Sequence, residues 1–326
     1  MPNPKVSIMV LTWNGKKFLK DCFSSLNKIS YSRKKYEVVM VDNGSEDGSV
    51  EYVKKFFPWV KVLALEKNYG FAEGNNRGID FCKGEFVVFL NQDTKVDKRW
   101  LIELVKPAIE DKKVGICAPL IRDFYHPQLI QSAANYLDVF GDVIHEGWGK
   151  KHVRFLNPVK VFSVSGTSLL IRRGVLDKLK YCFDPSYFIY FEDTDLCWRV
   201  NLLDYKVIFT PLSVVYHKAS IHPLEVKPIN IFLCARNKII SFRKNLRFPL
   251  KQLLLLLVLF RTFVATAYWK YKKKWSFGLK FLDALFLPIN QDIDLKKISL
   301  KKQLSLFAFP SIKKYYEFFS FVGRNL

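Results

Sequence analysis

The sequence predicts an α/β fold built on a mostly parallel, doubly wound sheet, because short apolar runs alternate with segments of helical period through the first 90 residues. Composition excludes a disordered chain, since 49% of the 326 residues are hydrophobic and 16% are aromatic. The formal net charge of +22 says nothing about the fold. It indicates either a soluble basic surface or an anionic partner such as nucleic acid, anionic lipid or a phosphorylated ligand.

Four apolar runs in the first part of the chain are predicted to be strands of this sheet. They lie at Val6–Thr12, Tyr36–Asp42, Val60–Glu66 and Phe86–Asn91. Helices are expected between them, because apolar residues recur at helical spacing at Phe18, Leu19, Cys22, Phe23 and Leu26, and again at Val50, Val53 and Phe57. A fifth run, Val114–Ala118, follows a helix-like segment at Trp100–Glu110.

The regular alternation then breaks, and residues 122–158 are predicted to be rich in loops. Order returns with strands at Val161–Val164, Ser168–Arg172 and Lys206–Phe209, and with a helix marked by Leu196, Cys197, Val200 and Leu203. Residues 250–326 carry 14 Lys and Arg against 4 Asp and Glu, interleaved with Leu, Phe and Tyr. We therefore predict an α/β domain over residues 1–222 and a basic, amphipathic helical extension over residues 223–326.

Several protein classes are excluded by missing motifs. The six cysteines lie at least 15 residues apart and never form a C-x-x-C pair, which argues against a zinc ribbon or a thioredoxin-type centre. No G-x-G-x-x-G follows the first strand, and no P-loop motif is present. The N-terminus runs directly into a strand without a signal-peptide pattern, so we expect folding to begin in the cytosol with reduced thiols.

Polar residues follow three of the predicted strands where each apolar run stops. These ends read Thr12-Trp13-Asn14-Gly15, Asp42-Asn43-Gly44-Ser45 and Asn91-Gln92-Asp93-Thr94. Turns and helix caps require the same residue types, so each end taken alone has an ordinary structural explanation. Ligands of open α/β sheets nevertheless bind beyond the carboxyl ends of strands.

Two of these features suit a nucleotide. A carboxylate at a strand end, as at Asp42, can accept the N3–H of a uracil or thymine ring. The loop KNYGFAEGNNRG offers glycines for close backbone approach and, in Arg77, a partner for phosphate. A surface turn leading into a helix is the alternative interpretation of this loop.

Six motifs, in this order, resemble the family 2 GT-A glycosyltransferases, close to the rhamnosyltransferase-like branch. They are VSIMVLTWNG, YEVVMVDNGSEDGS, KNYGFAEGNNRGI, FVVFLNQDT, SGTSLLIRR and FDPSYFIYFEDTDLCWR, and they cover roughly residues 6–217. The resemblance implies a GT-A fold for residues 1–222 and an inverting transfer of a sugar from a nucleotide-sugar donor. It does not extend to the C-terminal hundred residues.

The resemblance also implies roles for the donor-binding residues. Asp42 would recognise the pyrimidine, and Asp93, in the N-x-D form of the family's D-x-D motif, would bind a divalent cation, Mg²⁺ or Mn²⁺. His217 matches a metal-ligating histidine of similar enzymes, although a lone histidine is more often structural and His222 is a nearby alternative. The remaining nucleotide-binding set is Thr12, Asn14, Asn68, Asn76, Arg77 and Asn91.

The family's E-D pair falls on Glu192 and Asp193. The resemblance places the base that deprotonates the acceptor hydroxyl on Asp193 and leaves Glu192 to orient the acceptor or shape the site. Acidic residues are common in the first turn of a helix, which is the structural alternative for Asp195. We expect the helix N-terminus to keep the base ionised.

The C-terminal region contains an apolar run from Leu253 to Trp269 that is 17 residues long and interrupted by Arg261. The length is at the bottom of the spanning range, and a central arginine disfavours insertion. A stripe of Thr262, Thr266, Lys270 and Lys273, followed by a cluster of lysines and aromatic residues, favours an amphipathic helix lying at an anionic membrane surface. A helical extension that packs on the α/β domain is the alternative.

These observations predict a metal-dependent, inverting glycosyltransferase, cytoplasmic and peripheral on the inner face of the cell membrane. Its donor would be a dTDP- or UDP-sugar, with rhamnose as one candidate for the sugar. Its acceptor would be a glycan or a lipid-linked saccharide. The competing hypothesis is a non-catalytic protein on the same scaffold that binds membranes or other polyanions. No nucleic-acid-binding module is visible, and the G-x-G-T-R loop of sugar nucleotidyltransferases is missing.

Overall fold

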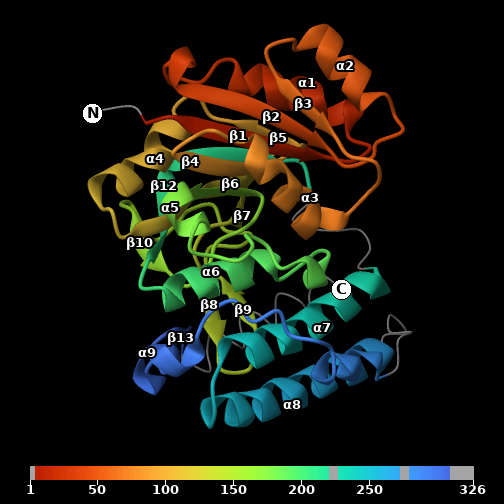
Figure 1. Cartoon of the computed structure of the whole chain (residues 1–326), viewed down its shortest axis with the longest axis vertical. Helices are drawn as coiled ribbons and strands as arrows, with labels where there is room; N and C mark the ends of the chain where they lie inside the picture. The colour runs from red at the N-terminus through yellow and green to blue at the C-terminus, as the bar shows by residue number, and fades with distance from the viewer. Residues whose placement is uncertain (1–3, 220–226, 272–278, 309–326) are drawn as a thin grey trace. The chain divides into compact units, whose positions relative to one another are not determined.

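The computed structural model describes residues 4–219, 227–271 and 279–308, and the chain divides into two compact units (Figure 1). The first unit comprises Met1–Asn135 and His145–Ala219, and the second comprises Tyr136–Ile144 and Ser220–Leu326. The second unit therefore includes residues 136–144, a short segment that interrupts the sequence of the first unit and that we call the excursion 136–144. No feature of the sequence had marked that excursion.

A central sheet of mixed strand direction forms the first unit. Its main path has the order β10-β12-β6-β11-β4-β1-β2-β3, with β5 paired to β12 and β7 paired to β6. The strands are β1 (Val6–Thr12), β2 (Tyr36–Asp42), β3 (Lys61–Ala64), β4 (Phe86–Asn91), β5 (Thr94–Val96), β6 (Val114–Asp123), β7 (Ile130–Ser132), β10 (Val159–Val161), β11 (Ser168–Arg172) and β12 (Lys206–His217).

The N-terminal half of this sheet is parallel, as the sequence predicts. β1 pairs in parallel with both β2 and β4, and β2 pairs in parallel with β3. β1 and β4 consist almost wholly of buried residues because they are central strands covered on both faces. The other half is mixed, since β11 runs antiparallel to both β4 and β6.

Among the residues that the structure describes, the first unit contains six helices. They are α1 (Lys16–Leu26), α2 (Ser49–Phe56), α3 (Gly70–Gly78), α4 (Trp100–Glu110), α5 (Arg173–Leu176) and α6 (Glu192–Leu202). The predicted apolar face of α1 is buried at Leu19, Cys22, Phe23 and Leu26. Short 3₁₀ turns occur at Arg33–Lys35, Ile79–Phe81 and Pro185–Tyr187. The five cysteines of this unit are buried and not in disulfides.

Two strands extend well beyond the apolar runs that predicted them. β6 continues to Asp123, and β12 continues to His217 through an irregularity between Thr210 and Val214. The long β12 then pairs antiparallel with β5, which places His217 opposite Thr94. The region predicted to be loop-rich contains β7 and the hairpin strands β8 (Asn135–Asp138) and β9 (Val143–His145).

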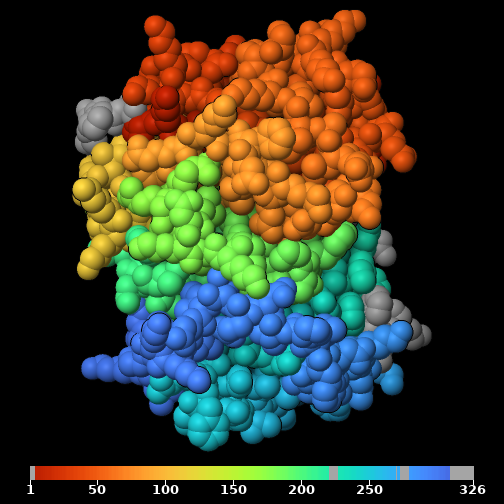
Figure 2. All heavy atoms as spheres, in the orientation of Figure 1, coloured from red at the N-terminus to blue at the C-terminus, as the bar shows by residue number. Residues whose placement is uncertain are grey.

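The second unit is built on two helices, α7 (Pro228–Asn245) and α8 (Leu250–Tyr271), which pack against each other. Residues 280–285 and 295–297 form 3₁₀ turns, followed by α9 (Leu300–Leu304) and β13 (Phe307–Ala308). β13 joins β8 and β9 in a three-stranded sheet. Figure 2 shows the blue 279–308 segment lying over the cyan helices of this unit.

α8 contains the predicted apolar run. Among the described residues it is the helix that is long and apolar enough to cross a membrane, at Leu250–Tyr268. Core helices of soluble proteins can have the same length and composition. Its threonines do not form the solvated stripe that the sequence indicates, because Thr262 and Thr266 are 3% and 5% exposed. Lys273 lies outside the described residues. The polar side of α8 is therefore directed into its own unit.

Candidate active site

The carboxyl ends of β1, β2 and β4 lie side by side, and the candidate site begins there. In the parallel registers Thr12 is opposite Asp42, and Leu11 is opposite Asn91. The chain adds β2 and β3 on one side of β1 and β4 on the other, so the strand order reverses beside β1. Such a reversal leaves a crevice outside the strand ends, where ligands of open sheets bind.

Asp42 and Thr12 present unpartnered polar atoms at this edge. Asp42 is 2% exposed, and its Oδ2 accepts a hydrogen bond of 3.0 Å from the Ser45 backbone N–H. Asp42 Oδ1 and Thr12 Oγ1 are buried without a hydrogen-bond partner in the described part of the chain. A buried acceptor without a donor is destabilising. The arrangement therefore favours a ligand that brings an N–H group to Asp42.

The loop after β1 is tied to both neighbouring strand ends. Asn14, which has a φ of 46°, donates its backbone N–H to Ser45 Oγ and accepts the Glu46 N–H at its Oδ1. On the other side Gln92 pairs with the backbone of Trp13 through both groups of its amide. Asn14 thus fixes the loop geometry around the crevice rather than standing as a free side chain.

Asn68 positions the glycine-containing start of α3 beside β2. Its Oδ1 accepts from Asn43 Nδ2 at 2.9 Å and from the Gly70 N–H at 2.8 Å. Asn43 also donates to the Gly70 carbonyl and accepts from the Tyr69 N–H. Gly70 has a φ of +80°, and a Cβ there would collide with Phe188. Sequence reasoning missed the role of Asn43, which only its place directly after Asp42 could have indicated.

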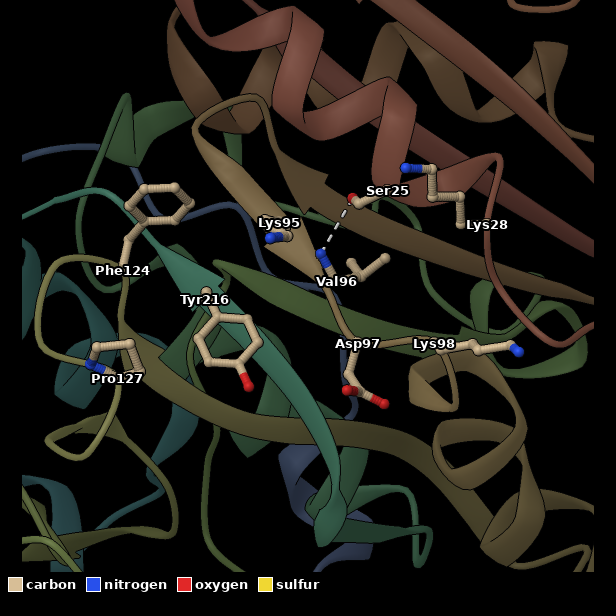
Figure 3. Close-up of a pocket in the computed structure, with 9 residues that line it drawn as sticks. All are labelled: Ser25, Lys28, Lys95, Val96, Asp97, Lys98, Phe124, Pro127 and Tyr216. Carbon is tan, nitrogen blue, oxygen red and sulfur yellow. Dashed lines mark hydrogen bonds between the residues drawn. The ribbon is translucent and has the colours of Figure 1, made fainter.

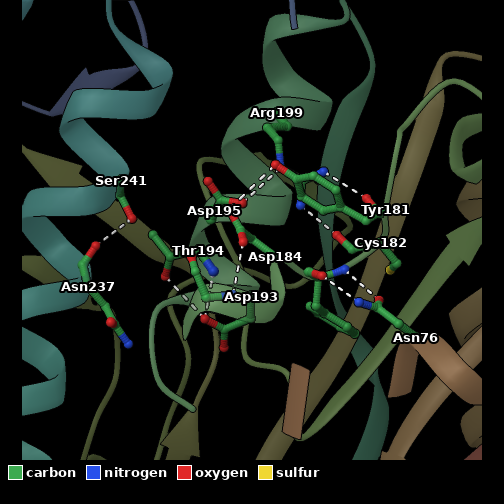
Figure 4. A network of polar contacts seen from close by, with 12 residues as sticks. Asn76, Tyr181, Cys182, Asp184, Asp193, Thr194, Asp195, Arg199, Asn237 and Ser241 are labelled. Carbon is green, nitrogen blue, oxygen red and sulfur yellow. Dashed lines mark hydrogen bonds and ion pairs between the residues drawn. The ribbon is translucent and has the colours of Figure 1, made fainter. Parts of the chain in front are cut away.

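The two predicted residues of α3 differ in availability. Both groups of the Asn76 amide pair with the backbone of Phe183, so this side chain joins α3 to the segment before α6 (Figure 4). Arg77 pairs with Glu73 at 2.9 Å and lies over the Tyr69 ring, with its side chain 43% exposed. The amide of Asn76 is therefore occupied by the backbone of Phe183, whereas the guanidinium of Arg77 is accessible to an anionic ligand.

The turn between β4 and β5 brings Asp93 to His217. Asp93 Oδ1 lies 3.2 Å from His217 Nε2, and the Asp93 carbonyl accepts the Lys218 N–H. Burial acts to raise the pKa of Asp93, but the hydrogen bond from His217 and the nearby charges of His217 and Lys218 hold it below its usual value. The pKa thus favours the ionised form of Asp93, which lies two residues after Asn91, the last residue of β4.

Gln131, on β7, fixes the orientation of His217. The amide nitrogen of Gln131 donates to the Ala219 carbonyl, so its Oε1 is the group that faces His217 Nδ1 at 2.5 Å. Nδ1 must therefore carry a proton, and Nε2 is the atom directed at Asp93. Gln131 was missed because it lies in the region predicted as loop. His222 lies outside the described residues.

Asp193 reaches the same edge through the segment that precedes β11. Asn91 donates its backbone N–H to Thr167, and the Gly166 N–H donates to Asp193 Oδ2 at 2.8 Å. Asp193 Oδ1 also accepts the backbone N–H and the hydroxyl of Thr194 (Figure 4). These contacts place the first turn of α6 next to the carboxyl end of β4.

Glu192 and Asp193 form a pair of unequal carboxyl groups. Burial raises the pKa of Glu192 well above its usual value, and the charges of Asp193 and Asp195 raise it further. Burial also raises the pKa of Asp193, but its three donors act in the opposite direction. Glu192 Oε2 is buried without a partner in the described region. Burial, rather than the helix N-terminus, thus decides the direction of both shifts, and Asp193 is the better-stabilised carboxylate.

The helix that carries this pair is anchored by a buried ion pair. Asp195 Oδ2 accepts from Arg199 Nε at 2.8 Å, and Arg199 also donates to the carbonyls of Tyr181 and Cys182. This agrees with the structural alternative for Asp195. Three residues immediately before α6 have positive φ, a costly conformation that often occurs at functional sites: Phe188, Tyr190 and Phe191.

A surface pocket of about 510 Å³ lies on the other face of the β5–β12 ladder (Figure 3). Lys95 is opposite Tyr216 in this ladder, as Thr94 is opposite His217. Because side chains alternate along a strand, Lys95 and Tyr216 point away from the His217 side. Lys28 and Lys98 also line the pocket, which is basic but separate from the candidate site.

Comparison with known proteins identifies one family. The model described as glycosyl transferase family 2 matches residues 7–180. Glycosyltransferase AglE of Haloferax volcanii is 30% identical over 101 residues, which is 30% of this chain and 33% of that protein. The chain spans between a quarter and about half the length of the first curated relatives that it matches.

Solved structures share the fold. S. aureus TarS (residues 1–349) in complex with UDP-GlcNAc gives a TM-score of 0.58 at 20% identity, covering 86% of this chain and 79% of that one. The mannosyltransferase PcManGT of Pyrobaculum calidifontis, in complex with GDP-Man and Mn²⁺, gives 0.56 at 19% identity, covering 83% and 76%. The predicted GT-A fold is confirmed, and the rhamnosyltransferase-like branch stays a prediction.

Proposed function

Because the chain belongs to glycosyl transferase family 2, we propose that it transfers a sugar, with inversion, from a nucleoside diphosphate to an acceptor hydroxyl. The observation that carries the proposal is that three groups lie at one sheet edge: Asp42, whose Oδ1 has no hydrogen-bond partner among the described residues, the Asp93–His217 pair, and Asp193. Relatives of this fold are solved with nucleotide sugars, which supports a nucleotide-sugar donor.

Recognition of the donor base falls to Asp42. Its unpartnered Oδ1 accepts the N3–H of a pyrimidine, while Thr12 Oγ1 lies opposite in the register and offers a second polar contact. Uracil and thymine present the same edge, so the proposed donor is a UDP- or dTDP-sugar, including dTDP-rhamnose. Arg77, with its accessible guanidinium, would face the diphosphate.

Asp93 and His217 fit a divalent cation, Mg²⁺ or Mn²⁺. Gln131 leaves Nε2 as the atom that faces the Asp93 carboxylate at 3.2 Å, and two such acceptors are compatible only when a proton or a cation lies between them. In the described residues no cluster of three or more His, Cys, Asp or Glu side chains forms a metal site, so diphosphate and water oxygens would complete the coordination. When bound, the cation would neutralise charge on the diphosphate leaving group.

Asp193 is the proposed general base. It removes the proton of the acceptor hydroxyl as that oxygen attacks the anomeric carbon, and the nucleoside diphosphate leaves from the opposite face. The Gly166 and Thr194 donors oppose the rise in the pKa of Asp193 that burial causes, and they hold the orientation of its carboxyl group. Glu192, whose pKa is raised most, stays protonated in this scheme and donates a hydrogen bond to the acceptor.

The acceptor is proposed to be a glycan or a lipid-linked saccharide of the cell surface, met at the cytoplasmic face of the membrane. The basic C-terminal region and the exposed apolar residues of α8 support a peripheral membrane location. We assign the acceptor site to the loop-rich region 122–158, in which Trp148 packs against the ring of His145.

Calorimetric titration with UDP, dTDP, GDP and ADP, each with and without Mn²⁺, tests the donor site. We expect metal-dependent binding of one or both pyrimidine diphosphates and little binding of the purine ones. Asp42→Asn should remove this preference, whereas Asp80→Asn, an exposed carboxyl in the 3₁₀ turn after α3, should not. Absence of nucleotide binding under every condition would refute the proposal.

A further inference from the structure

The helix α8 exposes its apolar side and buries its polar side. Leu253, Leu256, Phe260, Phe263, Val264 and Tyr271, which we call the outer stripe of α8, are between 47% and 81% exposed. They recur at spacings of three, four, three, one and seven, so they share one side of the helix. Only 28% of the apolar stretch of α8, which lies within Leu250–Tyr268, is buried, whereas the core helix of a soluble protein is mostly buried.

The opposite side of α8 carries the polar groups and faces its own unit. Thr262 and Thr266 are buried there, and Thr266 Oγ1 donates to the Phe263 carbonyl. Arg261 Nε donates to Asp142 Oδ2 at 2.8 Å, and Lys238 of α7 pairs with the other oxygen of Asp142. This charged cluster fixes which side of α8 is outward.

We propose that α8 lies flat on an anionic lipid bilayer and inserts its outer stripe among the lipid headgroups and upper acyl chains. The proposal deepens, and rests on, the membrane location in the proposed function. From Leu253 to Tyr271 the stripe is about 27 Å long at the rise of an α-helix. It combines large aliphatic and aromatic side chains, which is the composition of the lipid-facing side of interfacial helices.

Charge favours lipid over a second copy of this chain as the occupant. Lys270 is exposed beside the outer stripe, the sequence continues Lys272-Lys273-Lys274, and residues 250–326 are strongly basic. Two copies facing each other through this surface would bring like charges together, whereas anionic headgroups neutralise them.

The polar side of α8 argues against a helix that spans the bilayer. A spanning helix meets lipid around its whole circumference, and Arg261, with its partner Asp142, would then have to enter the hydrocarbon or separate. A helix that lies in the interface keeps this cluster within the protein. The geometry thus distinguishes an interfacial position from a spanning one.

Vesicle flotation of the full chain tests the proposal. We expect binding to vesicles of phosphatidylcholine that contain about 30% phosphatidylglycerol, whose surface is negatively charged. Binding to vesicles of phosphatidylcholine alone should be weak. The double variant F260S/F263S should lower the partition coefficient on anionic vesicles by at least about tenfold. The matched control F56S/F81S removes two phenylalanines of similar exposure from the first unit and should bind normally.

Further outcomes separate the alternatives. Unchanged vesicle binding by F260S/F263S would overturn the proposal, and so would a concentration-dependent dimer, measured by light scattering, that the same substitutions abolish. Resistance of the bound protein to carbonate extraction would instead indicate a spanning helix and contradict the flat orientation. Pyrimidine diphosphate titration of F260S/F263S should match the unsubstituted chain, so a failure of donor binding is distinguishable from a failure of lipid binding.

A second variant guards against misfolding of the first. Leu256→Cys labelled with an environment-sensitive dye should show a blue-shifted emission when anionic vesicles are added. The same dye on Phe56→Cys, in α2, should show no shift. Five native thiols are buried and Cys234 is partly buried, so a cysteine-light Cys234→Ser background keeps the labelling specific. An unshifted emission at position 256 would overturn the proposal.

Discussion

The helices α6 and α8 both bury polar side chains, but they differ in what covers their other sides. All residues of α6 except Asp193 are buried in the first unit, including Glu192, Asp195 and Arg199. α8 buries its polar side and leaves large apolar side chains in contact with solvent. Since apolar exposure on this scale is costly in water, the two helices are suited to different surroundings.

Each helix pairs an arginine with a carboxylate of its own unit. On α6 the guanidinium of Arg199 pairs with Asp195 four residues earlier, and on α8 Arg261 pairs with Asp142 of the excursion 136–144. Asp142 has a second cation in Lys238 of α7. Ion pairing is therefore common to both helices, and α6 carries in addition two carboxyl groups whose pKa values are raised by burial, Glu192 and Asp193.

The largest effect is expected from Asp193→Asn on α6. Removal of a general base lowers transfer by about 10²–10⁴-fold, while donor binding stays nearly intact because Asp193 does not contact the donor base. The measurement is turnover of a nucleotide sugar alongside diphosphate titration. Asp177→Asn, at an exposed position after α5, is the matched control. Unchanged turnover would remove Asp193 as the base.

The two ion-paired arginines, Arg199 and Arg261, should differ in their effect on stability. Arg199→Leu removes the ion-pair partner of a fully buried carboxylate and should lower the free energy of unfolding by about 3–5 kcal/mol. Arg261→Leu should cost only about 1–2 kcal/mol, because Lys238 still pairs with Asp142. Denaturant titration of both variants makes the comparison. Equal losses would show that the second cation of Asp142 contributes nothing.

Gln131→Leu should weaken Mn²⁺ binding by about 10–100-fold, because His217 loses the acceptor that orients its ring and fixes the proton on Nδ1. The measurement is Mn²⁺ titration in the presence of UDP or dTDP, followed by electron paramagnetic resonance. Gln128→Leu alters an exposed glutamine of the same loop and serves as the control. If Mn²⁺ affinity is equal in the two variants, Gln131 only packs against His217.

The sequence predicted the regions in which local pattern and fold agree. β1, β2, β4, β11 and α4 begin and end at the predicted residues, because apolar runs bounded by polar strand ends leave little freedom. The positions of Asp42 at the end of β2, Asp93 after β4 and Asp193 in the first turn of α6 were predicted as well. Their proposed roles stay predictions until they are measured.

Contacts between distant parts of the chain were not predictable from local pattern. Gln131 meets His217 across 86 positions of sequence, and Arg261 meets Asp142 across 119. β12 extends beyond its apolar segment because β5 and β6 supply hydrogen-bond partners for its backbone, and the local sequence of β12 does not predict these partners. Helical spacing predicted that Thr262 and Thr266 share one side of α8. It did not predict that this side faces inward, because that orientation depends on the distant partner of Arg261.

The smallest effect is expected at Asp138, which lies beside Asp142 in the second unit. Asp138 is fully buried, and burial together with the charge of Asp142 raises its pKa to about 6. Its Oδ1 accepts the backbone N–H groups of Phe140 and Asp142, and its Oδ2 has no partner within the described residues.

Because this folded-state pKa is above the unfolded one, the protonated carboxyl stabilises the fold at pH values below about 4, and that contribution is lost as the pH rises through about 6. Asp138→Asn is neutral at every pH, so it should match the unsubstituted chain near pH 3.5 and exceed it by about 1–2 kcal/mol at pH 7.5. Thermal unfolding at several pH values, with the exposed Asp283→Asn as control, measures the difference. A difference that did not change with pH would mean that Lys238 and Arg261 compensate both carboxylates at once, and the charged cluster behind α8 would then be neutral as a whole rather than balanced at Asp142 alone.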